Sequence, residues 1–453
     1  MPKCNDPAAF EQQLNSFVPA ERRSALEELQ TMVSSGEIAV QPMKAEVNLH
    51  FHTFFSFNAN GWSPSRIAWE ALKYGLEVAG IVDFDVLDGM DEFLAATKLL
   101  GLKATVGLES RVFIKELSDK EISSPNEPGI AYFMANGCFK RPTPGSDEDR
   151  ILTSMGETAR ARNVAMIARV NAYLDKVQLD YNADVAPLTP SGNATERHLL
   201  AAYDAKARKV FGNDSALFKF WSEKLGTDLS EAESLVPATP KFHEKLRSKL
   251  MKFGGVGYVA PENGSFPAIE DAIRMMHGME ALPTATWLDG TSAGEDDAME
   301  LLGLLASKGI VAANIIPDRN WNIKDSETKA LKTRKLKEFV EACRSFEMPI
   351  AVGTEMNKLG LPFVDDFSAP ELQPYVQDFM DGARCLYGHT LLAVCADFGY
   401  LSPGSISAFG DDARARRLFF TKVGRNIPSS ESMDKLAKLK GAAEPGKILE
   451  ILG

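Results

Sequence analysis

The stretch NLHFHTFFSFNANG, residues 48–61, places two of the chain's six histidines one residue apart. From Val47 to His52 apolar and polar side chains alternate, and this period of two predicts a β-strand. His50 and His52 then lie on the same face of the strand, where each imidazole can offer a nitrogen to one metal ion of borderline softness. Two partly buried, hydrogen-bonded histidines would give the same pattern, because histidine is often half buried. Further ligands elsewhere in the chain are needed to choose between the two interpretations.

Composition indicates a globular protein without a nucleic-acid-wrapping surface. The chain has 453 residues, of which 45% are hydrophobic and 25% charged, enough to bury a core and to keep the surface solvated. This length fits one large domain with insertions or two to three ordinary domains. Fifty basic against sixty-two acidic residues give a net charge of -12, which argues against an extended nucleic-acid-binding face.

The five cysteines and the N-terminal residues indicate the compartment. The cysteines are odd in number and scattered, and no two have CxxC spacing, so neither a disulfide framework nor a zinc ribbon is expected. The segment MPKCNDPAAFEQQLN lacks the apolar core of a signal peptide, and no stretch has the length of uncharged apolar residues that a membrane helix needs. We therefore expect a soluble cytoplasmic protein with no membrane partner.

Seven short apolar runs, several of them followed by helix-like segments, begin at residue 45. They are residues 45–52, 76–85, 102–109, 162–170, 281–290, 309–319 and 347–355. Strands that alternate with helices imply parallel βα units. Because several runs end in a polar or charged residue, a TIM-like α/β barrel is favoured over an open sheet, and the polar strand ends should meet at one end of it. These end residues are His50, His52, Asp83, Asp85, Glu109, Arg169, Asp289, Asp318, Arg319 and Glu355.

Three segments stand outside this alternation. Residues 1–44 have the pattern of an N-terminal helical segment. Within a barrel that would span residues 45–365, residues 190–280 are helical and loop-rich in pattern, and we expect them to form an inserted helical subdomain. Residues 366–453 are again helical in pattern, and we expect a C-terminal helical region that packs on the barrel.

Four short motifs lie at the predicted strand ends: LHFH (49–52), VDFDVLDG (82–89), GLE (107–109) and GTEMN (353–357). Their order and composition resemble the motifs of the PHP family, the polymerase and histidinol phosphatase superfamily of metal-dependent phosphoesterases. The resemblance covers residues 45–115 and 345–360. It implies a distorted barrel of seven βα units, with a divalent metal ion bound by His50, His52, Glu109 and Glu355.

The chain also departs from the family pattern. Phe84 and Asn357 replace histidines that ligate a third metal in the family, and Arg169 follows an alanine where the family has an Ala-His pair. Phenylalanine cannot bind a metal, and asparagine is a weak ligand for zinc or manganese. His198 or His277 could substitute for a missing ligand, although spacing alone does not show it. The resemblance therefore implies one zinc, manganese or iron ion per chain in place of a three-metal cluster.

Other polar residues near the predicted strand ends suit catalysis. Asp83 is a candidate catalytic base, with support of a neighbouring loop as the alternative. Arg169 and Arg319 are candidate catalytic residues that would hold an anionic substrate together with Lys358, because guanidinium groups bind phosphate and carboxylate in bidentate fashion. Salt bridges to nearby carboxylates would explain the same cations.

Two loops supply the remaining candidates. In GNATERH the pair Arg197 and His198 enters a predicted helix and could close over the site as a lid, with His198 catalytic and Arg197 bound to the substrate. Helix capping explains the neighbouring Asn and Thr but not this pair. In PDRNWN, Asn320 is a candidate substrate ligand, as is Asn357 in GTEMN, although a helix-start turn would also account for the first of them.

These residues favour a metal-dependent hydrolase that acts on a small anionic substrate, a phosphorylated metabolite or a sugar acid. The metal would lower the pKa of a bound water and present it as hydroxide to the reacting centre. A single metal also suits a sugar or sugar-acid isomerase or epimerase, in which a Lewis acid polarises a carbonyl and a carboxylate moves a proton. A non-catalytic scaffold with a PHP-like barrel is the third interpretation. No nucleic-acid partner is expected, and the sequence does not decide the oligomeric state.

Overall fold

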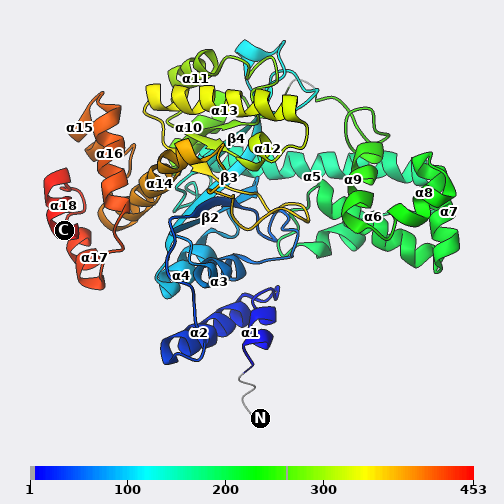
Figure 1. Ribbon diagram of the computed structural model, residues 1–453, viewed down its shortest axis with the longest axis horizontal. Coiled ribbons are helices and arrows are strands. Elements are labelled where there is room, and N and C mark those ends of the chain that lie inside the picture. Colours follow the sequence, from blue (N-terminus) through cyan, green and yellow to red (C-terminus); the bar gives the residue numbers. More distant parts are fainter. Residues whose placement is uncertain (1–5, 262–263) are drawn as a thin grey trace.

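A seven-stranded sheet forms the centre of the protein, in a computed structural model that describes residues 6–261 and 264–453 (Figure 1). The strands lie side by side in the order of the chain. Beyond the last strand, His52 N donates to Glu355 O at 2.9 Å and Phe51 forms a parallel bridge with Glu355, so the sheet returns to its first strand. This nearly closed sheet confirms the predicted α/β barrel. The strands are β1 (Val47–Phe51), β2 (Val78–Phe84), β3 (Lys103–Phe113), β4 (Ile130–Asn136), β5 (Leu282–Trp287), β6 (Ala312–Ile315) and β7 (Ile350–Val352).

The fourth strand departs from the prediction of parallel βα units. β4 runs antiparallel to both β3 and β5, whereas the other adjacent pairs are parallel. The predicted strand at 162–170 is wrong, because these residues lie inside α5 (Asp147–Leu174). Along this helix the buried residues Asn163, Ile167 and Val170 recur at helical spacing. The apolar run is therefore one face of an amphipathic helix.

Helices cover the outside of the barrel. The N-terminal pair packs against the helices that follow β1 and β2, and Arg22 ties it there by donating from two nitrogens to the carboxylate of Glu92. The helices around the strands share one hydrophobic core with them. They are α1 (Pro7–Gln13), α2 (Pro19–Ser35), α3 (Pro64–Tyr74), α4 (Met90–Leu100), α10 (Ile269–Gly278), α11 (Ala298–Ser307), α12 (Asp318–Trp321) and α13 (Ser326–Ser345).

A helical unit extends to one side of the barrel, at the right of Figure 1. It has a hydrophobic core of its own, which runs from Ile167 in α5 to Met251 and contains Trp221. The helical unit has other bounds than the predicted insertion at 190–280. It begins earlier, because α5 contributes to its core, and it ends earlier, because α10 packs in the barrel core. The unit combines the second half of α5 with α6 (Glu196–Phe211), α7 (Asp214–Leu225), α8 (Leu229–Leu235) and α9 (Thr239–Leu250).

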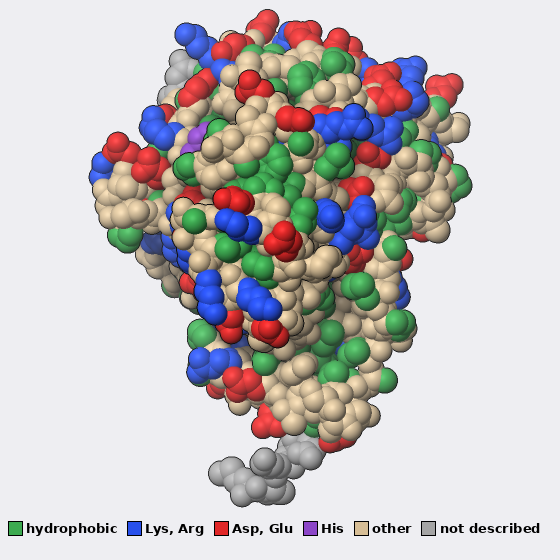
Figure 2. All heavy atoms as spheres, turned by 90° about the vertical axis from the view of Figure 1, so that its left-hand side faces the viewer, with side chains coloured by type: hydrophobic (Ala, Val, Ile, Leu, Met, Phe, Trp, Pro, Cys, Tyr) green, Lys and Arg blue, Asp and Glu red, His purple; other side chains and the backbone are tan. Residues whose placement is uncertain are grey.

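The C-terminal helices pack on the barrel near the start of β2 and β3. Arg384 of α14 donates to both oxygens of Glu77 at 2.8 Å, and Lys103 Nζ lies 3.1 Å from Glu77 Oε1. Basic and acidic side chains are interspersed over the outer face of these helices (Figure 2). Within residues 6–261 and 264–453 every helix is too short or too polar to cross a membrane. The C-terminal helices are α14 (Val376–Ala396), α15 (Pro403–Phe409), α16 (Ala413–Gly424), α17 (Ser430–Ala437) and α18 (Pro445–Leu452).

Candidate metal centre

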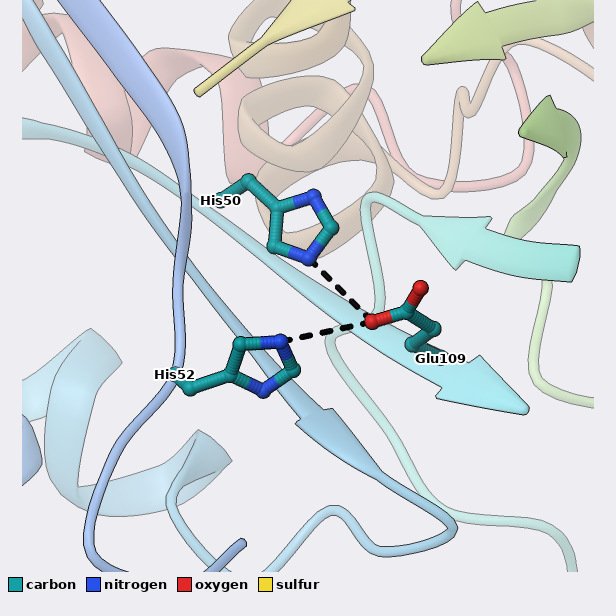
Figure 3. A group of neighbouring side chains, drawn as sticks. All are labelled: His50, His52 and Glu109. Atoms are coloured by element: carbon teal, nitrogen blue, oxygen red, sulfur yellow. Dashed lines mark hydrogen bonds and ion pairs between the residues drawn. The ribbon is translucent and has the colours of Figure 1, made fainter. Parts of the chain in front are cut away.

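His50, His52 and Glu109 converge at the C-terminal ends of the barrel strands (Figure 3). Both Nε2 atoms lie 3.3 Å from the same oxygen, Glu109 Oε2. A ligand atom from each residue lies within 4.8 Å of the others, and all three side chains are buried. Two imidazoles and a carboxylate that face one point fit a metal site, because these are donor groups that bind divalent ions of borderline softness.

Strand geometry brings the three side chains together. His50 lies in β1 and His52 directly after the end of that strand, and Glu109 lies two strands away on β3. The pairing of β1 with β2 shifts its register within β1, and such an irregularity re-aims side chains at a strand end. Just after β7, a Cβ at Gly353 would lie 2.5 Å from the Cβ of His50. The close approach of β7 to the first ligand therefore requires glycine at this position.

The charges of His50, His52 and Glu109 interact favourably with one another. Burial favours the neutral form of Glu109, but hydrogen bonds and charges from His50 and His52 outweigh it and lower the pKa of Glu109 to about 2. Burial likewise disfavours the charged form of His50, yet its contact with Glu109 and the charge of Glu355 raise the pKa of His50. The cluster therefore stabilises a positive charge, which a metal cation can supply in place of a proton.

The buried Nε2 atom of His52 suits a metal ligand. Its contact with Glu109 Oε2, at 3.3 Å, is longer than an ordinary N–H···O hydrogen bond, and coordination of a metal ion would satisfy the nitrogen and the carboxylate together. The other nitrogen of His52, Nδ1, lies 3.1 Å from Ser56 Oγ, and its ring stacks on Phe84 with centroids 4.5 Å apart. These contacts fix the ring with Nε2 toward Glu109.

Asp83 supports the loop after β1. It is not among the residues that line the cavity of ≈ 940 Å³ beside the candidate metal centre. Its Oδ1 accepts from Thr53 N at 2.8 Å and from Ser56 Oγ at 2.5 Å, and its Oδ2 accepts from Thr53 Oγ1 at 2.7 Å. Burial raises the pKa of Asp83, and the hydroxyl groups of Ser56 and Thr53 act against that rise. This geometry favours the loop-supporting role of Asp83 over the role of catalytic base.

Glu355 faces the same cavity and pairs with an arginine. Both of its oxygens accept from Arg319 Nη2 at 2.9 Å, and Oε2 lies 3.3 Å from Asn357 Nδ2. Glu355 is not part of the three-residue ligand group found among the described residues, so its role as fourth ligand stays a prediction. Glu355 and Met356 have φ angles of 62° and 51°, a backbone region that residues other than glycine rarely adopt. The chain is thus strained where it crosses the site.

A cavity of ≈ 940 Å³ opens between the strand ends and the helical unit, with Glu109 and Glu355 in its wall. Among the described residues, eight basic and seven acidic ones line it, so basic side chains are more frequent relative to acidic ones here than in the whole chain, which has a net charge of -12. Basic side chains that converge in a cleft attract anions. The basic residues are Arg111, Arg162, Arg169, Arg197, Arg247, Lys252, Arg319 and Lys358, and the acidic residues are Asp85, Glu109, Glu127, Glu196, Glu244, Asp318 and Glu355.

Several predicted substrate-side residues reach this cavity. Arg169 lies on α5 and not at a strand end, and its Nε and Nη2 donate to Gly257 O at 2.9 and 2.7 Å. Arg197, at the start of α6, pairs with Glu244 at 2.5 Å. The structure thus brings these side chains to one cavity but engages four of them with protein groups, since Arg319 and Asn357 contact Glu355. The predicted residues in the wall are Arg169, Arg197, Arg319, Asn357 and Lys358.

His198 and Asn320 are not among the residues that line the cavity. His198 is buried, and its Nδ1 accepts from Thr195 N at 3.1 Å in a capping box that begins α6. Burial lowers the pKa of His198 to about 4, which keeps the imidazole neutral at pH 7. Asn320 is buried in α12, where its Nδ2 lies 3.4 Å from Ile316 O. Both placements favour structural roles over the predicted catalytic and substrate-binding ones.

Some residues of the cavity wall were not predicted as site residues. Arg111 follows Glu109 by two residues on β3, so the strand period could have placed it on the same face. Asp85 stood among the predicted strand ends without a role, and its Oδ1 accepts from Ser110 Oγ at 2.5 Å. Arg162 gave no signal, because the segment around it was interpreted as a strand.

No protein-family model matches the chain, and no curated protein matches it in sequence. Two solved structures are similar to it. A protein from Bifidobacterium adolescentis, classed as a metal-dependent phosphoesterase, has 16% sequence identity and a TM-score of 0.47, over 74% of this chain and 97% of the other. An amidohydrolase from Chromobacterium violaceum, solved with bound sulfate and no metal, has 14% identity and a TM-score of 0.47, over 74% of this chain and 96% of the other. Similarity of this degree does not establish an activity.

Proposed function

We propose that the protein is a metal-dependent hydrolase, phosphoesterase-like and of PHP type, that acts on a small anionic metabolite. The observation that carries this proposal is the convergence of His50, His52 and Glu109 on one point beside a cavity rich in arginine. These residues belong to the two motifs in which the sequence resembles the PHP family most fully. A cavity of ≈ 940 Å³ suits a ligand of metabolite size.

The side chains around the cluster have separate tasks in this proposal. A divalent metal held by the three ligands would supply a water of lowered pKa. Arg319 uses only Nη2 in its contact with Glu355, so its other N–H groups can donate to an anionic group of the substrate. Glu355 fixes the position of this guanidinium. Lys358, in the same cavity wall, adds a second cation near the substrate.

A mononuclear-metal sugar or sugar-acid isomerase or epimerase is the second candidate. Among the described residues the ligand group has three members, and Phe84 stacks on His52 at a position where the family has a histidine. One metal can polarise a carbonyl as a Lewis acid, but it does not clamp both the attacking and the leaving oxygen of a phosphate ester. In this candidate Glu355 would carry the proton, with Arg319 holding it in place.

Metal analysis tests both candidates. Protein purified without added metal should hold about one equivalent of zinc, manganese or iron. The variant His52→Ala should lose this metal. His243→Ala is the matched control, because His243 contacts Asp204 within the helical unit. A Glu355→Gln variant separates two roles: loss of metal makes Glu355 the fourth ligand, and retention makes it the partner of Arg319.

Activity measurements then separate the candidates from each other. Release of inorganic phosphate from phosphorylated metabolites, abolished in His52→Ala, supports the hydrolase. Isomerisation or epimerisation of sugar acids without phosphate release supports the second candidate. Protein that holds no metal and turns over neither class of substrate would contradict both and leave the non-catalytic scaffold.

A further inference from the structure

Arg111 and Arg162 form a second cationic position in the cavity. Arg111 lies on β3 and Arg162 on α5, and both guanidinium groups lie against the ring of Phe266, with carbon-to-centroid distances of 4.3 and 4.5 Å. All three residues line the cavity. Burial and then the charge of Arg111 lower the pKa of Arg162 to about 10, against the charges of Asp85, Glu127 and Glu196, so Arg162 stays charged at pH 7 beside a like charge. The fold therefore holds two cations together at one aromatic ring.

The two arginines differ in their partners. Arg111 Nη1 donates to Glu127 Oε2 at 2.8 Å, and Glu127 also accepts from Ser124 Oγ. Within the described residues Arg162 has no ion pair at contact distance, and its Nη1 is buried without a hydrogen-bond partner. A buried charged donor without an acceptor costs free energy. The cavity thus presents a donor that an anionic ligand would satisfy.

β3 sets the position of this pair relative to the candidate metal centre. Glu109 and Arg111 are two residues apart on one strand, so they point to the same face, with Cα atoms about 7 Å apart. Across the antiparallel β3–β4 pairing Arg111 is opposite Tyr132, whose side chain lies on that face and also lines the cavity. Arg111 therefore lies two residues beyond the candidate metal ligand Glu109 on β3, in the same wall of the cavity.

We propose that Arg111 and Arg162 bind a second anionic group of the substrate, a phosphate or a carboxylate, at the end remote from the metal. This inference rests on the proposed function and names its substrate class: a small metabolite with two anionic groups, one beside the metal and one at this pair. Guanidinium groups suit both anions, because their N–H edges bind either one in bidentate fashion while their faces stack on aromatic rings. Phe266 supplies that ring.

Calorimetric titration with inorganic phosphate tests the pair in the full-length protein. Arg162→Gln should weaken phosphate binding about tenfold, because it removes one charged donor of the site. Arg162→Lys keeps the charge without the planar fork and should fall between Arg162→Gln and the wild type. Arg160→Gln is the matched control, since Arg160 lies on the same helix but contacts Asn182 and Tyr181. Its phosphate affinity should equal that of the wild type.

Acetate at the same ionic strength identifies the anion. If phosphate binding is the more sensitive to Arg162→Gln, the remote group is a phosphate, and if acetate binding is the more sensitive, it is a carboxylate. Phosphate and acetate affinities that are both unchanged in Arg162→Gln would overturn the subsite. Circular dichroism confirms that the variants compared are folded.

Metal content measured on the same samples separates this inference from the proposed function. Arg162→Gln should hold the same metal as the wild type, because Arg162 is not part of the ligand group. Arg162-dependent phosphate binding in protein that holds no metal would keep the subsite and contradict the hydrolase. If the protein holds metal but its anion affinity is unchanged in Arg162→Gln, the subsite is contradicted and the proposed hydrolase is not.

Discussion

Ser56 links the candidate metal centre to Asp83. Its Oγ lies 3.1 Å from His52 Nδ1 and donates to Asp83 Oδ1 at 2.5 Å. Thr53 gives Asp83 two further hydrogen bonds, so both carboxylate oxygens are engaged. A hydrogen bond to the non-ligating nitrogen of a metal-bound imidazole fixes its tautomer and its orientation. We therefore expect Asp83 to act as a positioning residue, through Ser56 and His52.

Asp83→Asn should weaken metal binding about 10- to 100-fold and destabilise the protein by about 2 kcal/mol. An amide keeps one acceptor oxygen but turns an N–H group toward donors of Thr53 or Ser56. Competition with a chelator measures the metal affinity, and urea unfolding measures the stability. Asp88→Asn is the control, because Asp88 contacts Arg141 near the surface. A metal affinity that stays at the wild-type value in Asp83→Asn would show that Asp83 does not position His52.

The part of the site that could be predicted depends on residues close together in the sequence, whereas the rest depends on contacts between residues far apart in the sequence. His50 and His52 could be placed together from sequence, because the period of a strand is local. A salt bridge from Arg319 to a nearby carboxylate was an alternative from the sequence, but Glu355 could not be identified as its partner, because the positive φ angles after β7 are not indicated by the preferences of glutamate. The stacking of Arg162 on Phe266 joins a helix to a distant loop, and no local pattern reports such a contact.

At the scale of the elements, β1 and β4 show why one strand was predicted and the other was missed. β1 alternates polar and apolar residues, although both of its faces are buried. β4, with the sequence IAYFMAN, is buried along nearly its whole length and lacks such alternation. The segment 162–170 has a short apolar run of similar composition, which periodicity alone does not distinguish from a buried strand. Its place in the long helix α5 became visible only with the helical spacing of the residues around it.

Gly353→Ala tests how tightly β7 packs against β1. The new Cβ would lie 2.4 Å from Asn48 Oδ1 and 2.5 Å from the Cβ of His50, so one strand must move. We expect a destabilisation of about 1 to 3 kcal/mol, as for other overpacked core positions, together with weaker metal binding. Thermal unfolding and metal content measure the two effects.

The control for this variant is Gly156→Ala, inside α5. A Cβ at Gly156 has no atom within 4 Å, and alanine favours a helix over glycine by about 1 kcal/mol, so this variant should be more stable than the wild type. If Gly353→Ala keeps both the stability and the metal of the wild type, the strand ends are more adaptable than their packing indicates.

At the scale of the whole molecule, the described residues form two hydrophobic cores. One joins the barrel to the N- and C-terminal helices, and the other lies within the helical unit. The cavity lies between these parts, and α5 runs from one core into the other, with Met155 in the first and Ile167 in the second. The sequence indicated the helical unit as an insertion at 190–280 but not the share of α5 in it, because the apolar run at 162–170 was interpreted as a strand. Two cores connected by one long helix should unfold as two units.

Glu77→Gln should destabilise the unit that contains the barrel by about 3 kcal/mol at pH 7. Glu77 is buried between Arg384 and Lys103, and a neutral amide leaves both cations without their carboxylate. Burial raises the pKa of Glu77, but the contacts with Arg384 and Lys103 outweigh it and lower the pKa below its ordinary value of 4.5. This stabilisation is therefore present above pH 4.5 and is lost as the pH falls through the lower pKa of the folded protein. The difference between wild type and variant should shrink over that pH range.

Hydrogen exchange resolves this loss of stability along the chain. In Glu77→Gln the amides of β2, β3 and α14 should exchange faster at pH 7, while those of α6, α7 and α9 keep the protection of the wild type. Glu341→Gln, which removes an exposed pair with Lys337 on α13, should leave both units unchanged. Faster exchange throughout the helical unit would show that α5 couples the two cores into one cooperative unit. Loss of the barrel contacts would then also destabilise the helix that carries Arg162 and Arg169 into the cavity wall.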